Sequence, residues 1–324
     1  MPARADGTVN SGKVPPMQRP LQPLLARLVD QVDSIIVGKR DRIEDCVACL
    51  VAGGHLLIED VPGVGKTTLA QALALSLGLR FARVQFTSDL MPSDLVGVSV
   101  FERSREAFVF HPGPVFTQVL LADEINRAGP RTQSALLEAM EERQVSVDHA
   151  THALPSPFFV VATQNPGDHL GTHPLPESQL DRFLMRITLG YPDRQAERAL
   201  LAGEDRRAAL ARLAPVMTPA ELQQAQAAAR GVSVSGALLD YLQALVEATR
   251  SGRWFAQGLS PRAALAVLSA ARARAFMAGR DYVAPDDLQA LLPQTIAHRL
   301  VPASGAGCGA REQVLAMVEA TPLP

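Results

Sequence analysis

The sequence predicts an α/β domain built on a mostly parallel sheet, followed by a smaller all-α domain. Up to Tyr191, short apolar runs of strand length alternate with helical patterns, as in a doubly wound sheet. Beyond Tyr191 the chain is rich in Ala, Leu and Arg, with helical periodicity and no convincing strand. A length of 324 residues suits two domains. We therefore expect a disordered arm over residues 1–20, the α/β domain over 21–192 with two hairpin insertions, and a helical domain over 193–324.

The predicted elements follow one another in a regular order. A helical pattern starts near residue 21, a second helix carries two cysteines, and a third is expected over Thr67–Leu77. A later helix is expected over Gln133–Glu142. The predicted strands are His55–Ile58, Phe81–Phe86, Val119–Ala122, Phe158–Ala162 and Met185–Leu189. Two stretches of alternating apolar and polar residues, 96–112 and 143–159, are typical of hairpins.

Composition and charge exclude several classes of protein. Hydrophobic residues make up 47% and charged residues 20%, the balance of a globular protein with a substantial core. The net charge of −2 provides no general attraction to nucleic acid or anionic lipid. No apolar run is long enough to span a bilayer, and the first residues lack the apolar segment of a secretory signal. We expect a cytoplasmic protein.

The chain has three cysteines, Cys46, Cys49 and Cys308. A low, odd count argues against a disulfide scaffold. Cys46 and Cys49 form a C-x-x-C motif, but zinc would need further ligands and there is no second such motif. They lie in a helical pattern with Ile43, Val47 and Leu50 on one face. We expect both thiols to pack in the core rather than to bind metal or undergo redox chemistry.

The stretch EDVPGVGKTTLA, residues 59–70, has the features of a phosphate-binding loop between a strand and a helix. Gly63 and Gly65 permit unusual backbone angles, Lys66 offers a charge to the outer phosphates, and Thr67 can place its hydroxyl on Mg²⁺. The usual pattern has a further glycine where this chain has Asp60. This position only ends the strand, so we expect the Asp60 carboxylate to point away from the phosphates.

Two further strands end in polar groups that suit magnesium phosphate chemistry. The run Val119–Ala122 is followed by Asp123 and Glu124. A carboxylate near the metal, usually through a bound water, is the role expected for Asp123, and orientation of the attacking water is the role expected for Glu124. A third strand ends at Asn165, whose amide could hold that water from the other side.

Several longer stretches together resemble the MoxR branch of the AAA+ ATPases. They are VPGVGKTTLA, ADEINRAGPRTQSALLEAMEERQV, PFFVVATQNP, LPESQLDRF and LSPRA, and they span most of residues 37 to 265 in the family's order. The resemblance implies a P-loop AAA+ α/β core with a helical lid, assembled as a ring that is usually a hexamer. ATP and Mg²⁺ are then expected between subunits.

The family's residue roles are carried over by this resemblance. Asp123 and Glu124 resemble the Walker B acids, Asn165 resembles sensor 1, and Arg182 resembles the arginine finger given to the neighbouring subunit. Arg262 resembles sensor 2, and whether it serves its own ATP or the neighbour's is left open. The nucleotide-binding residues implied besides Arg262 are Val37, Gly38, Pro62, Gly63, Val64, Gly65, Lys66, Thr67 and Thr68.

Other arginines compete for the role in trans. A planar cation supplied from outside stabilises the charge that develops on the γ-phosphate. Arg127 and Arg131 lie close to the Walker B acids in the sequence, and Arg182 could instead be a salt-bridged surface residue. We favour Arg182 as the residue that acts in trans.

The two hairpins match insertions that face the central channel in related machines. The first has Arg103 and Arg105 at its tip, where they either contact a client protein or simply keep an exposed hairpin soluble. The sequence supports the two interpretations equally.

Four functions are compatible with an ATPase ring. The resemblance favours a chaperone-like ATPase that remodels or matures a client, for example by metal or cofactor insertion, with a von Willebrand factor A (VWA) domain partner. A nucleic-acid motor is disfavoured by the near-neutral charge and by one tryptophan and three tyrosines. An unfoldase would need a separate protease. A non-hydrolysing scaffold is disfavoured by the intact set Lys66, Asp123, Glu124, Asn165 and Arg182.

Overall fold

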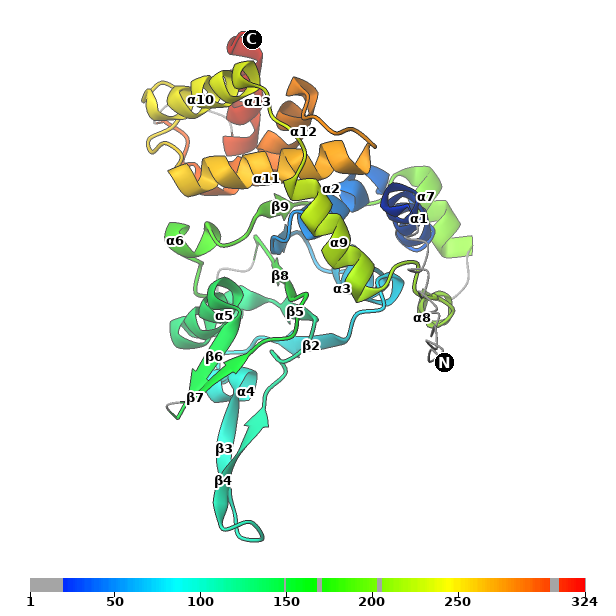
Figure 1. Ribbon diagram of the computed structural model, residues 1–324, viewed down its shortest axis with the longest axis vertical. Helices are drawn as coiled ribbons and strands as arrows, with labels where there is room; N and C mark the ends of the chain where they lie inside the picture. Colours follow the sequence, from blue (N-terminus) through cyan, green and yellow to red (C-terminus); the bar gives the residue numbers. More distant parts are fainter. Residues whose placement is uncertain (1–19, 149, 168–170, 203–205, 304–308, 324) are drawn as a thin grey trace, which may run out of the picture.

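The computed structural model describes residues 20–148, 150–167, 171–202, 206–303 and 309–323 (Figure 1). Apart from Pro20, the N-terminal arm expected over residues 1–20 lies outside these residues, as does Cys308. A five-stranded sheet with the order β2-β5-β8-β1-β9 lies at the centre, and all its paired strands are parallel. Its strands are β1 (Leu56–Glu59), β2 (Phe81–Gln85), β5 (Val119–Asp123), β8 (Phe159–Gln164) and β9 (Met185–Ile187). The predicted α/β class with a parallel sheet is confirmed.

All five predicted strands exist, with ends displaced by at most two residues. The largest differences are at β8, which continues to Gln164, and at β9, which ends at Ile187. His55, predicted as the first residue of a strand, precedes β1. Its ring forms the contacts: Nδ1 accepts the Val160 N–H, and Nε2 lies 3.2 Å from the Met140 oxygen. Complete burial lowers the His55 pKa to about 4, so the ring is neutral and joins β8 to helix α5 (Pro130–Glu142).

Both predicted hairpins are present as separate two-stranded sheets. The first joins β3 (Gly97–Glu102) to β4 (Ala107–Pro112), and the second joins β6 (Gln144–Val147) to β7 (Ala150–Ala153). Figure 1 shows the β3–β4 hairpin extending from the end of the molecule opposite the C-terminal helices. Arg103 and Arg105 are exposed near its tip, as expected.

Helices cover both faces of the sheet. The helices and helical turns of the α/β part are α1 (Leu21–Asp33), α2 (Arg40–Val51), α3 (Lys66–Ser76), α4 (Pro92–Val96), η1 (Ile125–Arg127), α5 (Pro130–Glu142) and α6 (Glu177–Leu180). Side chains alternate along each strand, so Leu56 and Ile58 join a core with α1, α2 and α3. Leu57 faces a second core that contains Leu136 of α5.

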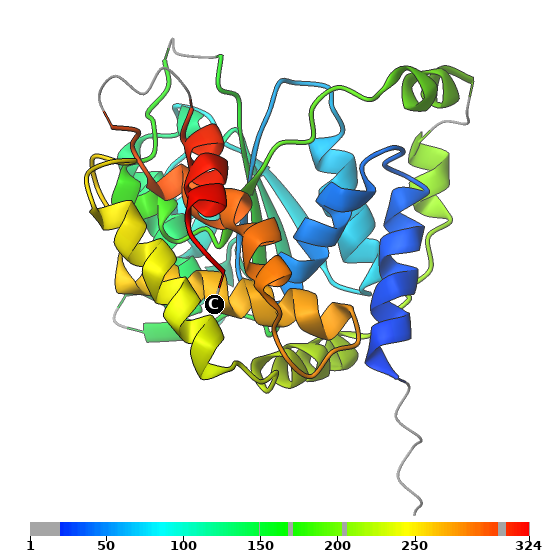
Figure 2. The ribbon, with the colours of Figure 1, turned by 90° about the horizontal axis from the view of Figure 1, so that it is seen from above.

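The C-terminal part is helical, apart from two isolated bridges in the described residues, Ser233 to Tyr282 and Phe255 to Pro302. It comprises α7 (Arg194–Ala202), α8 (Arg206–Ala211), α9 (Pro219–Arg230), α10 (Gly236–Arg250), α11 (Pro261–Met277), α12 (Pro285–Ile296), η2 (Ala297–Arg299) and α13 (Ala310–Ala320). Figure 2 shows α10 to α13 gathered on one side of the body. Their buried side chains belong to the same core as α1 to α3, so the helical part packs directly on the sheet domain.

Local sequence signals explain where the C-terminal helices begin. Thr218 caps α9 by accepting the Glu221 N–H, and Glu221 accepts the Thr218 N–H in return, which forms a capping box. Ser235 and Ser260 cap α10 and α11 with one such bond each. In the described part of the chain, no helix is long and apolar enough to cross a membrane.

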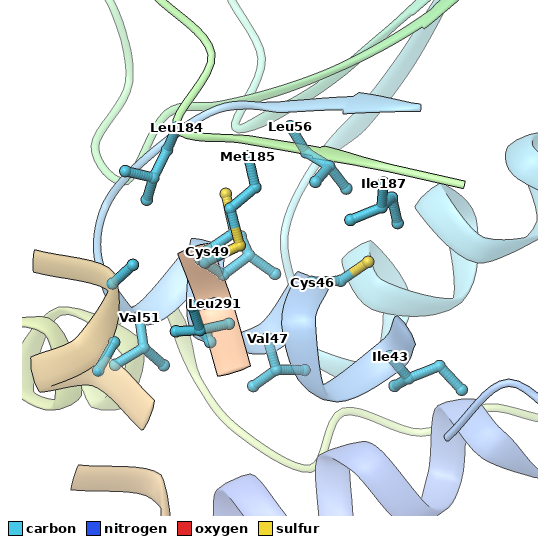
Figure 3. Packing of buried hydrophobic residues seen from close by; sticks show 14 of the residues in the cluster. Ile43, Cys46, Val47, Cys49, Val51, Leu56, Leu184, Met185, Ile187 and Leu291 are labelled. Atoms are coloured by element: carbon cyan, nitrogen blue, oxygen red, sulfur yellow. The ribbon is translucent and has the colours of Figure 1, made fainter. Parts of the chain in front are cut away.

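The two cysteines of the C-x-x-C motif lie in the core on α2, as Figure 3 shows. Cys46 and Cys49 are fully buried near β1 and β9, and Met185 and Leu291 belong to the same cluster. Burial raises the pKa of both thiols far above the usual range. The expectation of a packing role is confirmed by this position.

We predict that neither thiol reacts in the folded protein. Thiolates are the reactive species, and burial disfavours both ionisation and access. Iodoacetamide treatment at neutral pH followed by mass spectrometry should leave Cys46 and Cys49 unmodified, whereas both should be labelled in guanidinium chloride. Rapid native labelling of either cysteine would contradict the packing described here.

Candidate active site

Three adjacent strands bring the predicted site residues to one edge of the sheet. β8 lies between β1 and β5, with Glu59 beside Gln164 and Ala122 beside Ala162. The loop after β1, the acids at the end of β5 and Asn165 after β8 therefore meet around a cavity of about 350 Å³. The cavity is lined by Pro62, Gly63, Gly65, Lys66, Thr67, Thr68, Arg83, Gln85, Asp123, Glu124, Asn165 and Arg206.

The loop after β1 has the backbone that a phosphate cradle needs. Gly63 and Gly65 have φ values of +88° and +99°, a region that disfavours other residues. Helix α3 begins at Lys66, immediately after Gly65. The unpaired N–H groups of its first turn and the positive end of its dipole therefore face the cavity, an arrangement that binds anions.

The departure from the usual glycine pattern has a structural role. Asp60 is 5% exposed, and its carboxylate accepts the Val61 N–H at 2.8 Å and the Gly190 N–H at 2.6 Å. Asp60 is not among the residues with positive φ in the described chain, and it does not line the cavity. The expectation that its carboxylate points away from the phosphate site is confirmed, because that carboxylate joins the loop to the segment after β9.

Lys66 is half-buried, and its Nζ donates to the Asp60 backbone oxygen. Burial is the main cause of a lowered Lys66 pKa, and the negative charges of Asp60, Asp123 and Glu124 oppose that shift. An anion in the cavity would add to the groups that favour the charged ammonium.

Asp123 is held by two neighbouring strands. Thr163 of β8 donates its hydroxyl to Oδ1 at 2.6 Å, and Arg83 of β2 donates to Oδ2 at 2.7 and 3.1 Å. The residue is 8% exposed, so these bonds replace most of its hydration. The carboxylate is consequently fixed at the floor of the cavity.

Glu124 is positioned by an unusual backbone and by two side chains. It has a φ of +57°, which is uncommon for a residue other than glycine and occurs often at functional sites. Its N–H donates to the Thr163 hydroxyl at 2.9 Å. Its Oε2 accepts from Gln85 at 2.8 Å and lies 2.9 Å from Nε of Arg127. Thr163 thus supports both acids.

Asn165 lies at the cavity as predicted, with its Oδ1 accepting the Gly167 N–H at 3.3 Å. Gly38 lies at a second cavity of about 670 Å³, which is also lined by Lys39, Leu189 and Gly190. Ile36 lies beside Gly65, since its Cδ1 is 3.7 Å from the position of a Cβ at that glycine. Val37, between Ile36 and Gly38, is therefore placed next to the loop. Gly190, which donates its N–H to Asp60, lines the second cavity.

Arg182 and Arg262 form a separate cluster. Arg182 Nη1 lies 3.1 Å from Glu141 Oε2 and donates to the Leu137 oxygen at 2.6 Å. Arg262 Nη2 lies 2.9 Å from the other oxygen of Glu141. Neither arginine is among the described residues that line the loop cavity. The structure thus brings the two predicted arginines together but away from the chain's own Lys66.

The competing arginines are placed differently. Arg127 lies next to Glu124 of its own chain, whereas Arg131 is exposed at the start of α5. Four residues of the site were not predicted: Arg83, Gln85 and Arg206 line the cavity, and the buried Thr163 bonds to Asp123. Thr163 and Gln85 had a signal, since each is a polar residue at the end of an apolar strand. In the described part of the chain, no group of three or more His, Cys, Asp or Glu is arranged to hold a metal.

Comparison with known proteins gives two family matches. Residues 55–185 match the ATPase family associated with various cellular activities (AAA), and residues 247–315 match an AAA lid domain. The first match contains the loop, Asp123, Glu124 and Asn165. The second contains Arg262, the whole of α11 and α12, and the turn η2.

Individual proteins are similar over most of the chain. "Uncharacterized protein YeaC" of Bacillus subtilis is 45% identical, covering 88% of this chain and 89% of its own length. "Chaperone MoxR1" of Mycobacterium tuberculosis is 43% identical, with coverages of 86% and 75%. "Protein MoxR" of Methylorubrum extorquens is 32% identical, with coverages of 85% and 87%.

A solved structure of a candidate ATPase from Cytophaga hutchinsonii superposes with a TM-score of 0.84 at 34% identity. The match covers 94% of this chain and 96% of the other. The P-loop geometry, the two family matches and these relatives all agree: this chain belongs to the MoxR family of AAA+ ATPases.

Proposed function

We propose that the chain hydrolyses ATP with Mg²⁺ in a homo-oligomeric ring, taken as a hexamer, and uses the reaction to remodel a client protein. One observation carries the catalytic part. The loop cavity contains the groups that bind a triphosphate and orient water, while Arg182 and Arg262 lie elsewhere on the same chain. A site completed by a second copy accounts for both facts.

Triphosphate binding uses backbone and side chain together. The N–H groups from Pro62 to Thr68, excluding proline, surround the phosphates at the start of α3. Lys66 supplies a flexible cation. Burial disfavours its charged form, and the negative charge of bound ATP offsets that effect. Val37 and Gly38 contact the base, and Gly38 lines the second cavity.

The residues at the floor fit a magnesium ion. The Thr67 hydroxyl and the Asp123 carboxylate are hard oxygen donors in one cavity, as Mg²⁺ prefers. Both oxygens of Asp123 already accept hydrogen bonds, so Asp123 would hold the ion through water, and Thr67 would hold it with its hydroxyl. Bound Mg²⁺ would neutralise charge on the outer phosphate oxygens.

Hydrolysis requires an oriented water. Glu124 accepts a proton from this water, and Asn165 holds it from the opposite side. Gln85 and Arg127 both contact Oε2 of Glu124, which fixes the direction of its carboxylate. Charge that develops on the γ-phosphate is then stabilised by Arg182 of a neighbouring copy, with Arg262 beside it.

The remodelling role rests on the relatives and on the hairpin. One relative is named a chaperone, "Chaperone MoxR1". The β3–β4 hairpin extends from the body and presents the edge-to-face pair Phe101–Phe108, with Phe108 74% exposed, near Arg103 and Arg105. Such a hairpin suits contact with another polypeptide. We propose that the partner is a VWA-domain protein and that metal or cofactor insertion is one form of client maturation. The proposed location is the cytoplasm.

We predict that Lys66→Ala and Glu124→Gln separate binding from hydrolysis. Removing a partly desolvated cation that pairs with phosphate costs about 2–5 kcal/mol, so Lys66→Ala should weaken ATP binding by roughly 30-fold or more. Glu124→Gln is nearly isosteric and should bind ATP normally but hydrolyse it about 100-fold more slowly or worse. Titration calorimetry and phosphate release measure the two effects, with each variant serving as the control for the other. Unchanged affinity in Lys66→Ala would refute the loop assignment.

Arg182→Ala should retain ATP binding and lose turnover by about 10³-fold, the usual effect of an arginine finger. Mixed with the Lys66→Ala protein, it should regain part of its activity, because intact loops then meet intact arginines. Arg131→Ala is the matched comparison and should hydrolyse ATP normally. Absence of recovery in stable mixed rings, or loss of turnover in Arg131→Ala alone, would count against Arg182 acting in trans.

We predict that protein rather than nucleic acid regulates the ATPase. A VWA-domain protein encoded beside this chain should raise the rate of phosphate release, while single- and double-stranded DNA should leave it unchanged at low salt. DNA stimulation that falls steeply with salt would instead support the motor alternative.

A further inference from the structure

One side chain in the loop cavity comes from outside the sheet domain. Arg206 is the first residue of α8, and it lines the cavity together with Lys66, Thr67 and Asp123. It is half-buried, and its Nη1 is 3.5 Å from the position of a Cβ at Gly65. Arg206 therefore reaches the centre of the loop whose backbone is proposed to hold the phosphates.

Arg206 differs from the other cations at this cavity in having no recorded partner. Lys66 donates to the Asp60 oxygen, and Arg83 pairs with Asp123. Within the described residues, no hydrogen bond or ion pair is recorded for Arg206. A half-buried guanidinium beside the unpaired N–H groups of a helix N-terminus is complementary to an anion.

The charge of the lining points the same way. Three cationic side chains, Lys66, Arg83 and Arg206, face two anionic ones, Asp123 and Glu124, so the lining carries a net charge of +1. Without Arg206 the net charge would be zero, although the cavity would still have to hold a magnesium–nucleotide complex that is itself negative. Arg206 thus supplies the excess positive charge of the pocket.

The position of α8 is fixed relative to the loop. Ala209 and Leu210 pack against the main core. Helix α8 also contacts α3, the helix that directly follows the loop (Figure 1). Residues three and four apart share one face of a helix, so the face that anchors α8 also directs Arg206 inward. Arg206 is therefore attached to the loop's own helix rather than to the distant cluster of Arg182, Glu141 and Arg262.

We infer that Arg206 binds the β- or γ-phosphate of the nucleotide held by its own chain. The inference rests on the proposed ATPase function and extends it by a residue. Arg262, the lid arginine suggested by the sequence, lies with Arg182 instead of at this cavity. Arg206 would then be the arginine of the same chain that binds phosphate, since Arg83 is paired with Asp123, and the neighbouring chain would supply the others.

The test measures Mg-ATP, Mg-ADP and adenosine binding to the full chain by titration calorimetry. Arg206→Ala should weaken ATP binding by roughly tenfold to a hundredfold, the usual effect of losing a hydrogen bond to a charged group. Arg206→Lys should recover part of the loss. Arg198→Ala on α7, an exposed arginine, is the matched control and should bind as the unmodified chain does.

The nucleotide series identifies the contact. An equal loss for ATP and ADP assigns Arg206 to the β-phosphate, and a loss for ATP alone assigns it to the γ-phosphate. An equal loss for adenosine would overturn the inference, as would normal ATP affinity in Arg206→Ala. If Arg206→Ala unfolds at a lower temperature, Arg206→Gln provides the same comparison with less change in size. The proposed function is tested separately by Lys66→Ala. If that variant loses ATP binding while Arg206→Ala does not, the proposed function is supported and only the inference about Arg206 is wrong.

A mixing experiment tests the assignment to the same chain. In mixtures of Arg206→Ala and Lys66→Ala proteins, every intact loop belongs to a chain that lacks Arg206, so high affinity should not return. Return of the original affinity in such mixtures would show that Arg206 acts on the neighbour's nucleotide and would overturn the assignment.

Discussion

The side-by-side arrangement of β1, β8 and β5 is the constraint on which the rest of the structure depends. Parallel strands end at the same edge of the sheet. This edge therefore brings together the loop after β1, Asn165 after β8 and the acids at the end of β5. The central strand also contributes Thr163, whose hydroxyl bonds both to the Asp123 carboxylate and to the Glu124 N–H. The two acids therefore keep a fixed relation, because one buried hydroxyl holds them both.

The same constraint explains why, in the proposed scheme, one protomer holds only part of the catalytic set. The edge of the sheet provides carboxylates, an amide and backbone N–H groups, whereas the cluster around Glu141 of α5 takes Arg182 from the segment between α6 and β9 and Arg262 from α11. Glu141 keeps two arginines together and neutralises part of their mutual repulsion. A pair of guanidinium groups held in this way can be presented as one unit to a phosphate of another molecule. Assembly then becomes a condition for hydrolysis in the proposed scheme.

Much of the fold and of the candidate site could be predicted from the sequence, for identifiable reasons. Apolar runs of strand length located all five strands, and the Gly63 and Gly65 positions were found because left-handed backbone favours glycine. Asp60 was correctly expected to avoid the phosphates, but its bond to Gly190 could not be predicted, since it joins residues 130 positions apart. Strand ends were missed by one or two residues where polar side chains such as Gln164 continue the pairing.

The two missed arginines share a physical cause. Arg83 and Arg206 lie in segments where arginine is common, so composition gives no reason to single them out. Their roles arise from contacts across the fold: Arg83 meets Asp123 because β2 pairs with β5, and Arg206 meets Gly65 because α8 packs on α3. Similarly, the separation of Arg262 from the loop follows from the packing of the C-terminal helices, which periodicity alone cannot reveal.

Helix α5 connects the features that must act together. It follows directly from the turn that holds Arg127 against Glu124, it carries Glu141 near its C-terminal end, and it leads through Arg143 into β6 of the second hairpin. Arg143 has a φ of +53°, so the chain turns sharply from the helix into the hairpin. A helix of 13 residues behaves as a stiff rod of about 20 Å, and a tilt at one end is passed to the other. A change in how Glu124 is held is therefore geometrically linked both to the two arginines that we propose act on a neighbour's nucleotide and to a hairpin on the surface.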